Sequence, residues 1–204
     1  MTNLFAHNPT ENLLPFDGIV NDLGQLIAQP TALYEQLLNE LPWQSDKVTL
    51  FGKTHITTRQ IVWMGEDATI YQYSGHQRQA IAWSEAVFHV KQLIENRLAD
   101  IGVLISFNTC LLNYYPTGED GMGYHADDEP ELGYQPIIAS LSLGAPRKFV
   151  LKHKTSKDKV ELMLDAGQLI VMRGDTQTYW KHTITKTKTV KQGRISLTFR
   201  RMVG

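Results

Sequence analysis

The stretch Arg194-Ile-Ser-Leu-Thr-Phe-Arg200 alternates strictly between polar and apolar residues. Side chains two positions apart on a β-strand point to the same side. One face of this stretch therefore carries Ile, Leu and Phe, and the other carries Arg194, Ser196, Thr198 and Arg200. The apolar face predicts packing into a hydrophobic core. The polar face offers two guanidinium groups and two hydroxyls, a set that suits an anion. A solvated polar face is the alternative interpretation.

Further short strands are predicted upstream of this stretch, each bounded by turn residues. They cover residues 108–115, 137–144, 148–153, 159–164 and 168–172. Two helices are predicted before them. The first is capped by Thr31 and ends before Pro42, and the second is capped by Ser84. The second has an apolar stripe at helical spacing, formed by Val87, Val90, Ile94, Leu98 and Ile101. This order predicts an α+β, mainly β fold: a double-stranded β-helix (jelly roll) with helices packed on one face.

Length and composition set the class of protein. The chain has 204 residues, which suits one domain, and 42% of them are hydrophobic, which suffices for a full core. A single cysteine, Cys110, excludes a disulfide framework and favours a reducing compartment. We see no signal peptide and no apolar run of about 18 residues, so we expect no membrane span. The expected location is the cytoplasm.

Charge is divided unevenly along the chain. Residues 1–146 hold 6 Lys/Arg and 17 Asp/Glu, a net charge of −11, whereas residues 147–204 hold 14 and 4, a net charge of +10. A concentrated basic face is typical of a protein that binds a phosphate backbone. A solvated surface of strands and loops is the alternative.

Two histidines and one aspartate form a candidate metal site. His125 and Asp127 are two positions apart, so in extended chain both side chains point the same way. A jelly roll can return His182 to the same ion on a later strand. Two imidazoles and a carboxylate are the ligand set of a non-haem Fe(II) oxygenase, which leaves other coordination positions open. Taken alone, each histidine is more often a hydrogen-bonded structural group.

From about Leu50 to Met202 the chain resembles the AlkB family of Fe(II)/2-oxoglutarate dioxygenases, and within it the branch of the human DNA-repair homologues 2 and 3. The Arg-x5-Arg pattern that ends in Thr-Phe-Arg200 is far more specific than the metal triad. The other matching stretches are Leu111-Leu-Asn-Tyr-Tyr115, His125-Ala-Asp-Asp-Glu129, Ile138-Ala-Ser-Leu-Ser-Leu-Gly-Ala-Pro-Arg-Lys-Phe149 and the region of His182.

The resemblance implies an oxidative demethylase that uses Fe(II), 2-oxoglutarate and O2. Its substrates would be 1-methyladenine and 3-methylcytosine in DNA, and it would release formaldehyde. The catalytic iron would be bound by His125, Asp127 and His182. The residues that would hold 2-oxoglutarate are Asn113, Tyr115, Arg194, Thr198 and Arg200. Of these, Arg194 and Tyr115 would contact the distal carboxylate, and Thr198 and Arg200 the carboxylate near the metal.

The resemblance also implies a nucleotide-recognition lid at residues 46–83, between an N-terminal arm with a short helix at 1–45 and a jelly-roll core at 84–204. A methyl group on a Watson–Crick edge cannot reach an iron centre inside a duplex, so the base must be flipped out. Phe51, Gly52 and Lys53 would form a finger that fills the vacated space. The other substrate-binding residues implied are Tyr71, Gln72 and Tyr73, which would stack on the base, and Asp128 and Glu129, which would favour a cationic one. Core packing of Phe51 and Tyr73 and an ion pair of Asp128 with an arginine are the structural alternatives.

Three other functions stay open: an RNA demethylase of the same chemistry, a 2-oxoglutarate hydroxylase of a protein or small molecule, and a nucleic-acid-binding module with a structural metal. The basic C-terminal part and the aromatic residues at 51, 71 and 73 favour a base-bearing polyanion. The open coordination positions and the dicarboxylate pocket argue against a mere binding module. We expect a monomer that acts on alkylated DNA, associated with the nucleoid in a bacterium or located in the nucleus of a eukaryote.

Overall fold

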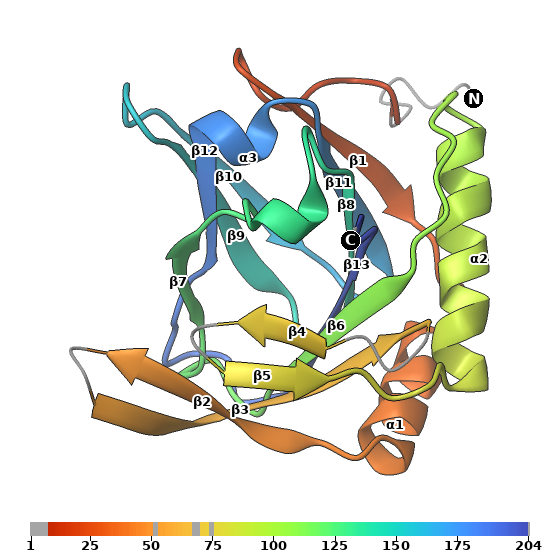
Figure 1. The fold of residues 1–204 in the computed structure, drawn as a ribbon, viewed down its shortest axis with the longest axis vertical. Helices are drawn as coiled ribbons and strands as arrows, with labels where there is room; N and C mark the ends of the chain where they lie inside the picture. The colour runs from red at the N-terminus through yellow and green to blue at the C-terminus, as the bar shows by residue number, and fades with distance from the viewer. Residues whose placement is uncertain (1–7, 51–52, 67–69, 74–75, 204) are drawn as a thin grey trace.

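Two antiparallel sheets face each other across the molecule in this computed structural model, which describes residues 8–50, 53–66, 70–73 and 76–203 (Figure 1). The larger sheet has the order β1 (Ile19–Gln25), β11 (Gln168–Arg173), β8 (Ile138–Gly144), β13 (Arg194–Arg200), β6 (Thr109–Tyr115), β3 (Lys53–Gly65) and β2 (Gln44–Leu50). The smaller sheet has the order β10 (Lys159–Leu164), β9 (Arg147–His153), β12 (Trp180–Ile184) and β7 (Met122–His125). A separate hairpin pairs β4 (Ile70–Tyr73) with β5 (His76–Gln79).

Two helices cover the outer face of the larger sheet, away from the smaller one (Figure 1). They are α1 (Pro30–Glu40) and α2 (Glu85–Ala99). Strand β13 shows how the two faces differ: Ile195, Leu197 and Phe199 are fully buried in the cluster that contains the apolar stripe of α2. A second cluster, which includes Leu151 and Ile170, fills the space between the sheets. The jelly roll with helices on one face is therefore confirmed.

Each predicted strand is present, with ends that differ from the prediction by no more than one residue. Ser84 caps α2 as predicted, since its Oγ accepts a hydrogen bond of 3.3 Å from the Val87 amide. The cap assigned to Thr31 is wrong. Helix α1 already begins at Pro30, whose fixed φ suits a first helical position, and Gln29 precedes it without a side-chain cap.

The division into arm, lid and core stays a prediction. Strand β1 of the predicted arm and strands β2 and β3 of the predicted lid all belong to the larger sheet, at its opposite edges. No helix in the described part of the chain is long and apolar enough to cross a membrane.

The single thiol is predicted to be unreactive in the folded protein. Cys110 is fully buried on β6, and burial raises the pKa of its thiol well above the usual range. Only the thiolate attacks disulfide reagents. At pH 8 we expect a colorimetric disulfide reagent to detect no thiol in the native protein and one per chain in guanidinium chloride. Rapid reaction of the native protein would show that the strand opens readily.

Candidate active site

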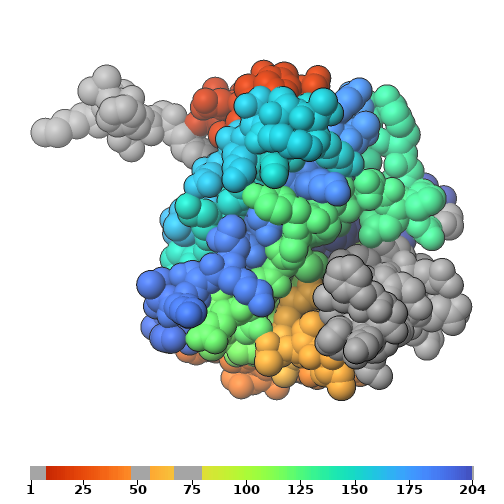
Figure 2. Space-filling model, turned by 90° about the vertical axis from the view of Figure 1, so that its left-hand side faces the viewer, coloured from red at the N-terminus to blue at the C-terminus, as the bar shows by residue number. Residues whose placement is uncertain are grey.

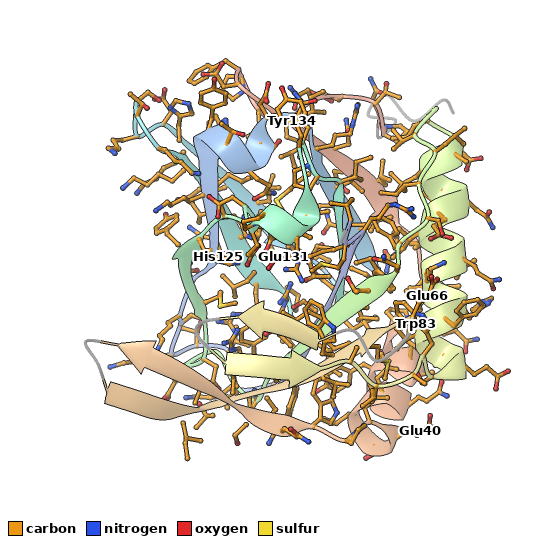
Figure 3. All side chains as sticks on the ribbon, in the orientation of Figure 1. Glu40, Glu66, Trp83, His125, Glu131 and Tyr134 are labelled. Carbon is orange, nitrogen blue, oxygen red and sulfur yellow. The ribbon has the colours of Figure 1, made fainter. Side chains whose placement is uncertain are left out.

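The smaller sheet brings the two predicted metal-binding histidines together. His125 is the last residue of β7, and His182 lies directly opposite it on β12 in the antiparallel pairing. Their ring centroids are 4.2 Å apart. Asp127 follows two residues after the strand ends, and one ligand atom from each of the three residues lies within 4.8 Å of the others. Figure 3 shows His125 between β7 and the short 3-10 helix η1 (Pro130–Leu132). The predicted triad is thus a single cluster.

The protonation states of this cluster suit a divalent metal. Burial and the neighbouring His125 lower the pKa of His182 to about 3, although Asp127 acts in the opposite direction. The ring is therefore neutral at pH 7 and keeps a lone pair for a ligand bond. His125 Nδ1 lies 2.9 Å from the Gly123 carbonyl oxygen. A neutral His125 that donates there has its other nitrogen, Nε2, available to a metal.

Asp127 is held so that one carboxylate oxygen is left over. Burial alone raises the pKa of Asp127, but Arg200 and the two histidines outweigh it and lower the pKa to about 2. Oδ1 accepts a hydrogen bond of 2.8 Å from Arg200, and the backbone amide donates one of 2.9 Å to Gln177 Oε1. Oδ2 is buried, has no hydrogen-bond partner among the described residues, and lies 3.8 Å from His182 Nε2. A buried, ionised oxygen of this kind is stabilised by a cation.

The triad opens onto a cavity between the two sheets, which also contains a buried arginine. Arg194 on β13 is 1% exposed and donates a hydrogen bond of 2.9 Å to Ser142 Oγ, but its Nε and Nη1 have no partner in the described part of the chain. Burial lowers its pKa to about 10, while Tyr115, whose ring centroid is 5.6 Å from the guanidinium, raises it. Arg194 therefore stays charged at pH 7. A buried cation with donors left on two nitrogens fits a carboxylate.

The other predicted co-substrate residues line the same cavity. They are Asn113 and Tyr115 on β6 and Thr198 and Arg200 on β13. Arg200 is committed in part to Asp127, so its contact with a carboxylate of the co-substrate stays a prediction. The polar face of β13 is thus an internal surface, and the solvated alternative is wrong.

The two acidic residues beside the triad differ from each other. Asp128 is exposed, and its Oδ2 lies 3.3 Å from Lys154 Nζ, which also donates to the Gln177 carbonyl. Asp128 therefore forms an ion pair, which was the structural alternative for this residue, but its partner is a lysine and not an arginine. Glu129 is half-buried, and its Oε2 is buried without a hydrogen-bond partner among the described residues. Of the two, Glu129 is therefore the one with a buried carboxylate oxygen that no described residue pairs with, and its contact with a base stays a prediction.

The predicted lid residues lie wholly or partly outside the described part of the chain. Phe51 and Gly52 lie outside the described residues. Lys53 begins β3 and Tyr71, Gln72 and Tyr73 form most of β4, but their side chains also lie outside the described part. Their contacts with a base stay predictions.

Sequence patterns missed three residues that contact the site. Ser142, which binds Arg194, alternates with Leu141 and Leu143, so the two-residue period that revealed the polar face of β13 could have found it. Gln177, which binds the Asp127 amide, lies on the four-residue helix α3 (Thr176–Tyr179). Arg59 on β3 donates to Asn113. No periodic signal marks the last two, because their roles arise only from tertiary contacts.

The sequence of residues 25–200 matches the family model of the 2OG-Fe(II) oxygenase superfamily. The chain belongs to this superfamily. It is 34% identical over 184 residues to the alpha-ketoglutarate-dependent dioxygenase alkB homolog 3 of Bos taurus, covering 85% of this chain and 62% of that protein. It is 32% identical over 187 residues to the DNA oxidative demethylase ALKBH2 of Mus musculus, covering 86% of this chain and 76% of that protein. The predicted resemblance to AlkB homologues 2 and 3 is confirmed.

Solved structures confirm the oxygenase fold. The structure of OsALKBH1 matches with a TM-score of 0.63 at 18% identity, covering 92% of this chain and 99% of that one. An oxidoreductase of the 2OG-Fe(II) oxygenase family from Burkholderia pseudomallei matches with a TM-score of 0.61 at 17% identity, covering 90% and 84%. At these identities the likeness concerns the fold alone.

The superfamily implies Fe(II), 2-oxoglutarate and O2, and the donors of this oxygenase fit them. Asp127 Oδ2, which has no hydrogen-bond partner among the described residues, would hold the iron together with the His125 and His182 imidazoles, and the Nε and Nη1 donors of Arg194 would hold a carboxylate. When bound, iron with 2-oxoglutarate and O2 supplies the oxidising power for a hydroxylation. The apolar side chains of Leu111, Phe149 and Ile184 also line the cavity.

Proposed function

We propose that this oxygenase repairs DNA by hydroxylating the alkyl group of N-alkylated bases such as 1-methyladenine and 3-methylcytosine, which then release formaldehyde. One observation carries the oxygenase chemistry: one buried cavity is lined by the metal triad and by Arg194, whose Nε and Nη1 have no hydrogen-bond partner among the described residues. The relatives named as DNA oxidative demethylases support the choice of DNA. The chain spans 62% of the first of its curated relatives, the homolog 3 of Bos taurus.

The outer face of the smaller sheet supports a polyanionic substrate. Figure 2 shows this face, with β9, β10, β12 and β7 toward the viewer. A cleft of about 280 Å³ here is lined by Tyr124, Lys152, His153, Lys154, Lys157 and Lys181. Lys152 and Lys181 lie directly opposite each other on β9 and β12. Like charges at opposed positions destabilise a sheet, so their presence favours a bound anion.

The basic cleft lies directly behind the metal centre. Neighbouring residues of a strand point to opposite faces, so Tyr124 reaches the outer cleft while His125 faces the interior. On β12, Lys181 likewise lines the outer cleft, whereas His182 lines the internal cavity. A phosphate backbone bound at the cleft would therefore lie close to the strands that carry the iron ligands.

Salt dependence tests the role of this cleft. Lys152→Gln with Lys181→Gln should weaken binding to a methylated duplex and reduce the slope of log affinity against log salt by about 2, because each lost phosphate contact releases about 0.9 fewer counterions. Fluorescence anisotropy at several salt concentrations measures both. Arg97→Gln, on α2 beyond the larger sheet, is the control and should leave the slope unchanged. An unaltered slope in the lysine variant would remove the cleft from the DNA interface.

The recognition of the base is proposed to depend on Glu129 and on the predicted finger and stacking residues, Phe51 to Lys53 and Tyr71 to Tyr73. A carboxylate with a buried, unpartnered oxygen favours a cationic base, and 1-methyladenine and 3-methylcytosine are cationic when protonated. Asp128 contributes less, because Lys154 neutralises it. The monomeric state and the cytoplasmic location stay predictions.

Methyl loss from matched oligonucleotides tests the substrate class. The protein, reconstituted anaerobically with Fe(II) and then given O2 and 2-oxoglutarate, should demethylate 1-methyladenine in DNA faster than in RNA of the same sequence. Mass spectrometry of the nucleosides gives both rates. A faster rate on RNA would replace the proposal with RNA demethylation. Turnover of 2-oxoglutarate without demethylation of either would indicate a protein or small-molecule hydroxylase.

A further inference from the structure

Arg59 is a buried cation that the proposed catalysis does not use. It lies on β3, is 5% exposed, and makes a buried ion pair with Asp46 of β2. Its Nη1 donates to Asn113 Oδ1 at 2.9 Å and to Met122 Sδ at 3.0 Å. Both acceptors line the cavity that contains the metal triad. Arg59 thus connects the edge of the larger sheet to the proposed co-substrate pocket.

Strand pairing explains why these two charges are buried side by side. Asp46 lies at an irregularity of the β2–β3 pairing, between Ser45, which pairs with Gln60, and Lys47, which pairs with Ile56. Such irregularities redirect side chains. Arg59 directly precedes Gln60, where the pairing of β3 with β6 begins. The guanidinium can therefore reach across to Asn113 on β6.

The contact with Arg59 decides which way the Asn113 amide faces. A guanidinium has donors only, so the Asn113 atom beside it must be the acceptor Oδ1. The amide nitrogen, Nδ2, is then the polar atom left for the cavity that Asn113 lines. With the amide turned over, Nδ2 would oppose Nη1, and two donors would face each other without an acceptor.

We propose that Arg59, fixed by Asp46, is a positioning residue for 2-oxoglutarate: it holds the Asn113 amide with its N–H groups toward the co-substrate. A carboxylate accepts hydrogen bonds and cannot donate them when ionised. An Asn113 amide that presented its oxygen would repel the dianion. The role of Arg59 rests on the proposed function, because 2-oxoglutarate is expected in this cavity only if the chain is such an oxygenase.

Binding of 2-oxoglutarate to the full-length protein loaded with Mn(II), which does not turn over, tests this role by calorimetry. Replacing the pair by apolar residues, Asp46→Leu with Arg59→Met, removes both of its charges together. It should weaken 2-oxoglutarate binding about tenfold, as expected for one lost hydrogen bond to a charged group. Asn113→Ala should cause a similar loss. The variant with all three changes should bind no more weakly than Asn113→Ala, because Arg59 acts through Asn113.

Arg173→Lys is the matched control. Arg173 donates to Asn21 Oδ1 at 3.0 Å, so it forms another Arg–Asn contact in the larger sheet, but neither residue lines the cavity. Its 2-oxoglutarate affinity should equal that of the wild type. Urea unfolding verifies that each variant folds. If the apolar pair fails to fold, Arg59→Lys keeps a charge for Asp46 and should still bind 2-oxoglutarate more weakly, since lysine lacks the planar fork that serves two acceptors.

Two outcomes would overturn the role of Arg59. One is unchanged 2-oxoglutarate affinity in the folded pair variant or in Arg59→Lys. The other is a variant with all three changes whose loss of 2-oxoglutarate affinity equals the product of the losses in the pair variant and in Asn113→Ala. Such independent effects would mean that Arg59 does not act through the Asn113 amide. Failure of the wild type itself to bind 2-oxoglutarate would instead contradict the proposed function.

Discussion

Asp127→Asn is expected to lower Fe(II) affinity by more than about a hundredfold and to abolish demethylation. The loss should exceed the roughly 10- to 100-fold that follows when a residue that only supports a metal ligand is removed. The carboxylate carries the negative charge of the triad, and its Oδ2 is the buried oxygen without a hydrogen-bond partner among the described residues. Asparagine keeps the shape and an acceptor for Arg200 but removes the charge. Anaerobic titration with Fe(II), followed by methyl-loss assays, measures both effects.

Asp128→Asn is the matched control for that variant. It removes the same charge from the neighbouring residue, but Asp128 is exposed and pairs with Lys154 outside the triad. Its Fe(II) affinity should stay within about threefold of the wild-type value. Equal losses in the two variants would show that general charge, and not ligation by Asp127, controls metal binding.

Arg194→Met is expected to weaken 2-oxoglutarate binding by about 10- to 100-fold, the range for a hydrogen bond to a charged group. The same change should leave the ligand-free protein at least as stable as the wild type. Arg194 is a buried cation whose Nε and Nη1 have no hydrogen-bond partner in the described part of the chain, so without the dianion its burial costs stability. Calorimetry with the Mn(II)-loaded protein and thermal unfolding with and without 2-oxoglutarate separate the two effects.

Arg147→Met provides the contrasting control. Arg147 is equally buried, but its guanidinium donates to the backbone carbonyls of Thr117, Gly118, Asp120 and Thr185. Its loss removes all four of these hydrogen bonds, although the Thr117 and Gly118 carbonyls also accept from the backbone amides of Asp120 and Thr187. We therefore expect the free energy of unfolding to fall by about 3 kcal/mol or more. If Arg194→Met destabilised the ligand-free protein as strongly, Arg194 would be a structural residue and not an anion site.

The alternation in Arg194–Arg200 predicted the polar side of β13 that faces the site, because a strand has a fixed period of two. It predicted which side chains of β13 pack into a hydrophobic core and which form a polar face; in the structure the first set lies in the cluster that includes α2 and the second lines the cavity. The pairing of His125 with His182 followed only from the expected fold, since 57 positions separate them. Gln177 and Arg59 could not be predicted, because each acts through one contact with a residue distant in sequence.

The start of α1 shows a different limit. Threonine is a good cap in general, yet at Thr31 the preceding proline already provides a first helical residue, so the helix begins one position earlier. The sequence also could not predict that Asp128 is exposed, because it follows closely after two predicted iron ligands, His125 and Asp127. Its pairing depends on Lys154, a residue of the turn after β9.

Formaldehyde release from a 1-methyladenine DNA oligonucleotide, followed over time in parallel reactions with and without 2-oxoglutarate and Fe(II), shows whether the protein demethylates DNA oxidatively. We predict release in step with methyl loss when both are present, and neither product when either is omitted or when Asp127 is replaced by asparagine. Methyl loss that persists without 2-oxoglutarate, or that survives the replacement of Asp127, would rule out a 2-oxoglutarate-dependent reaction at this metal triad.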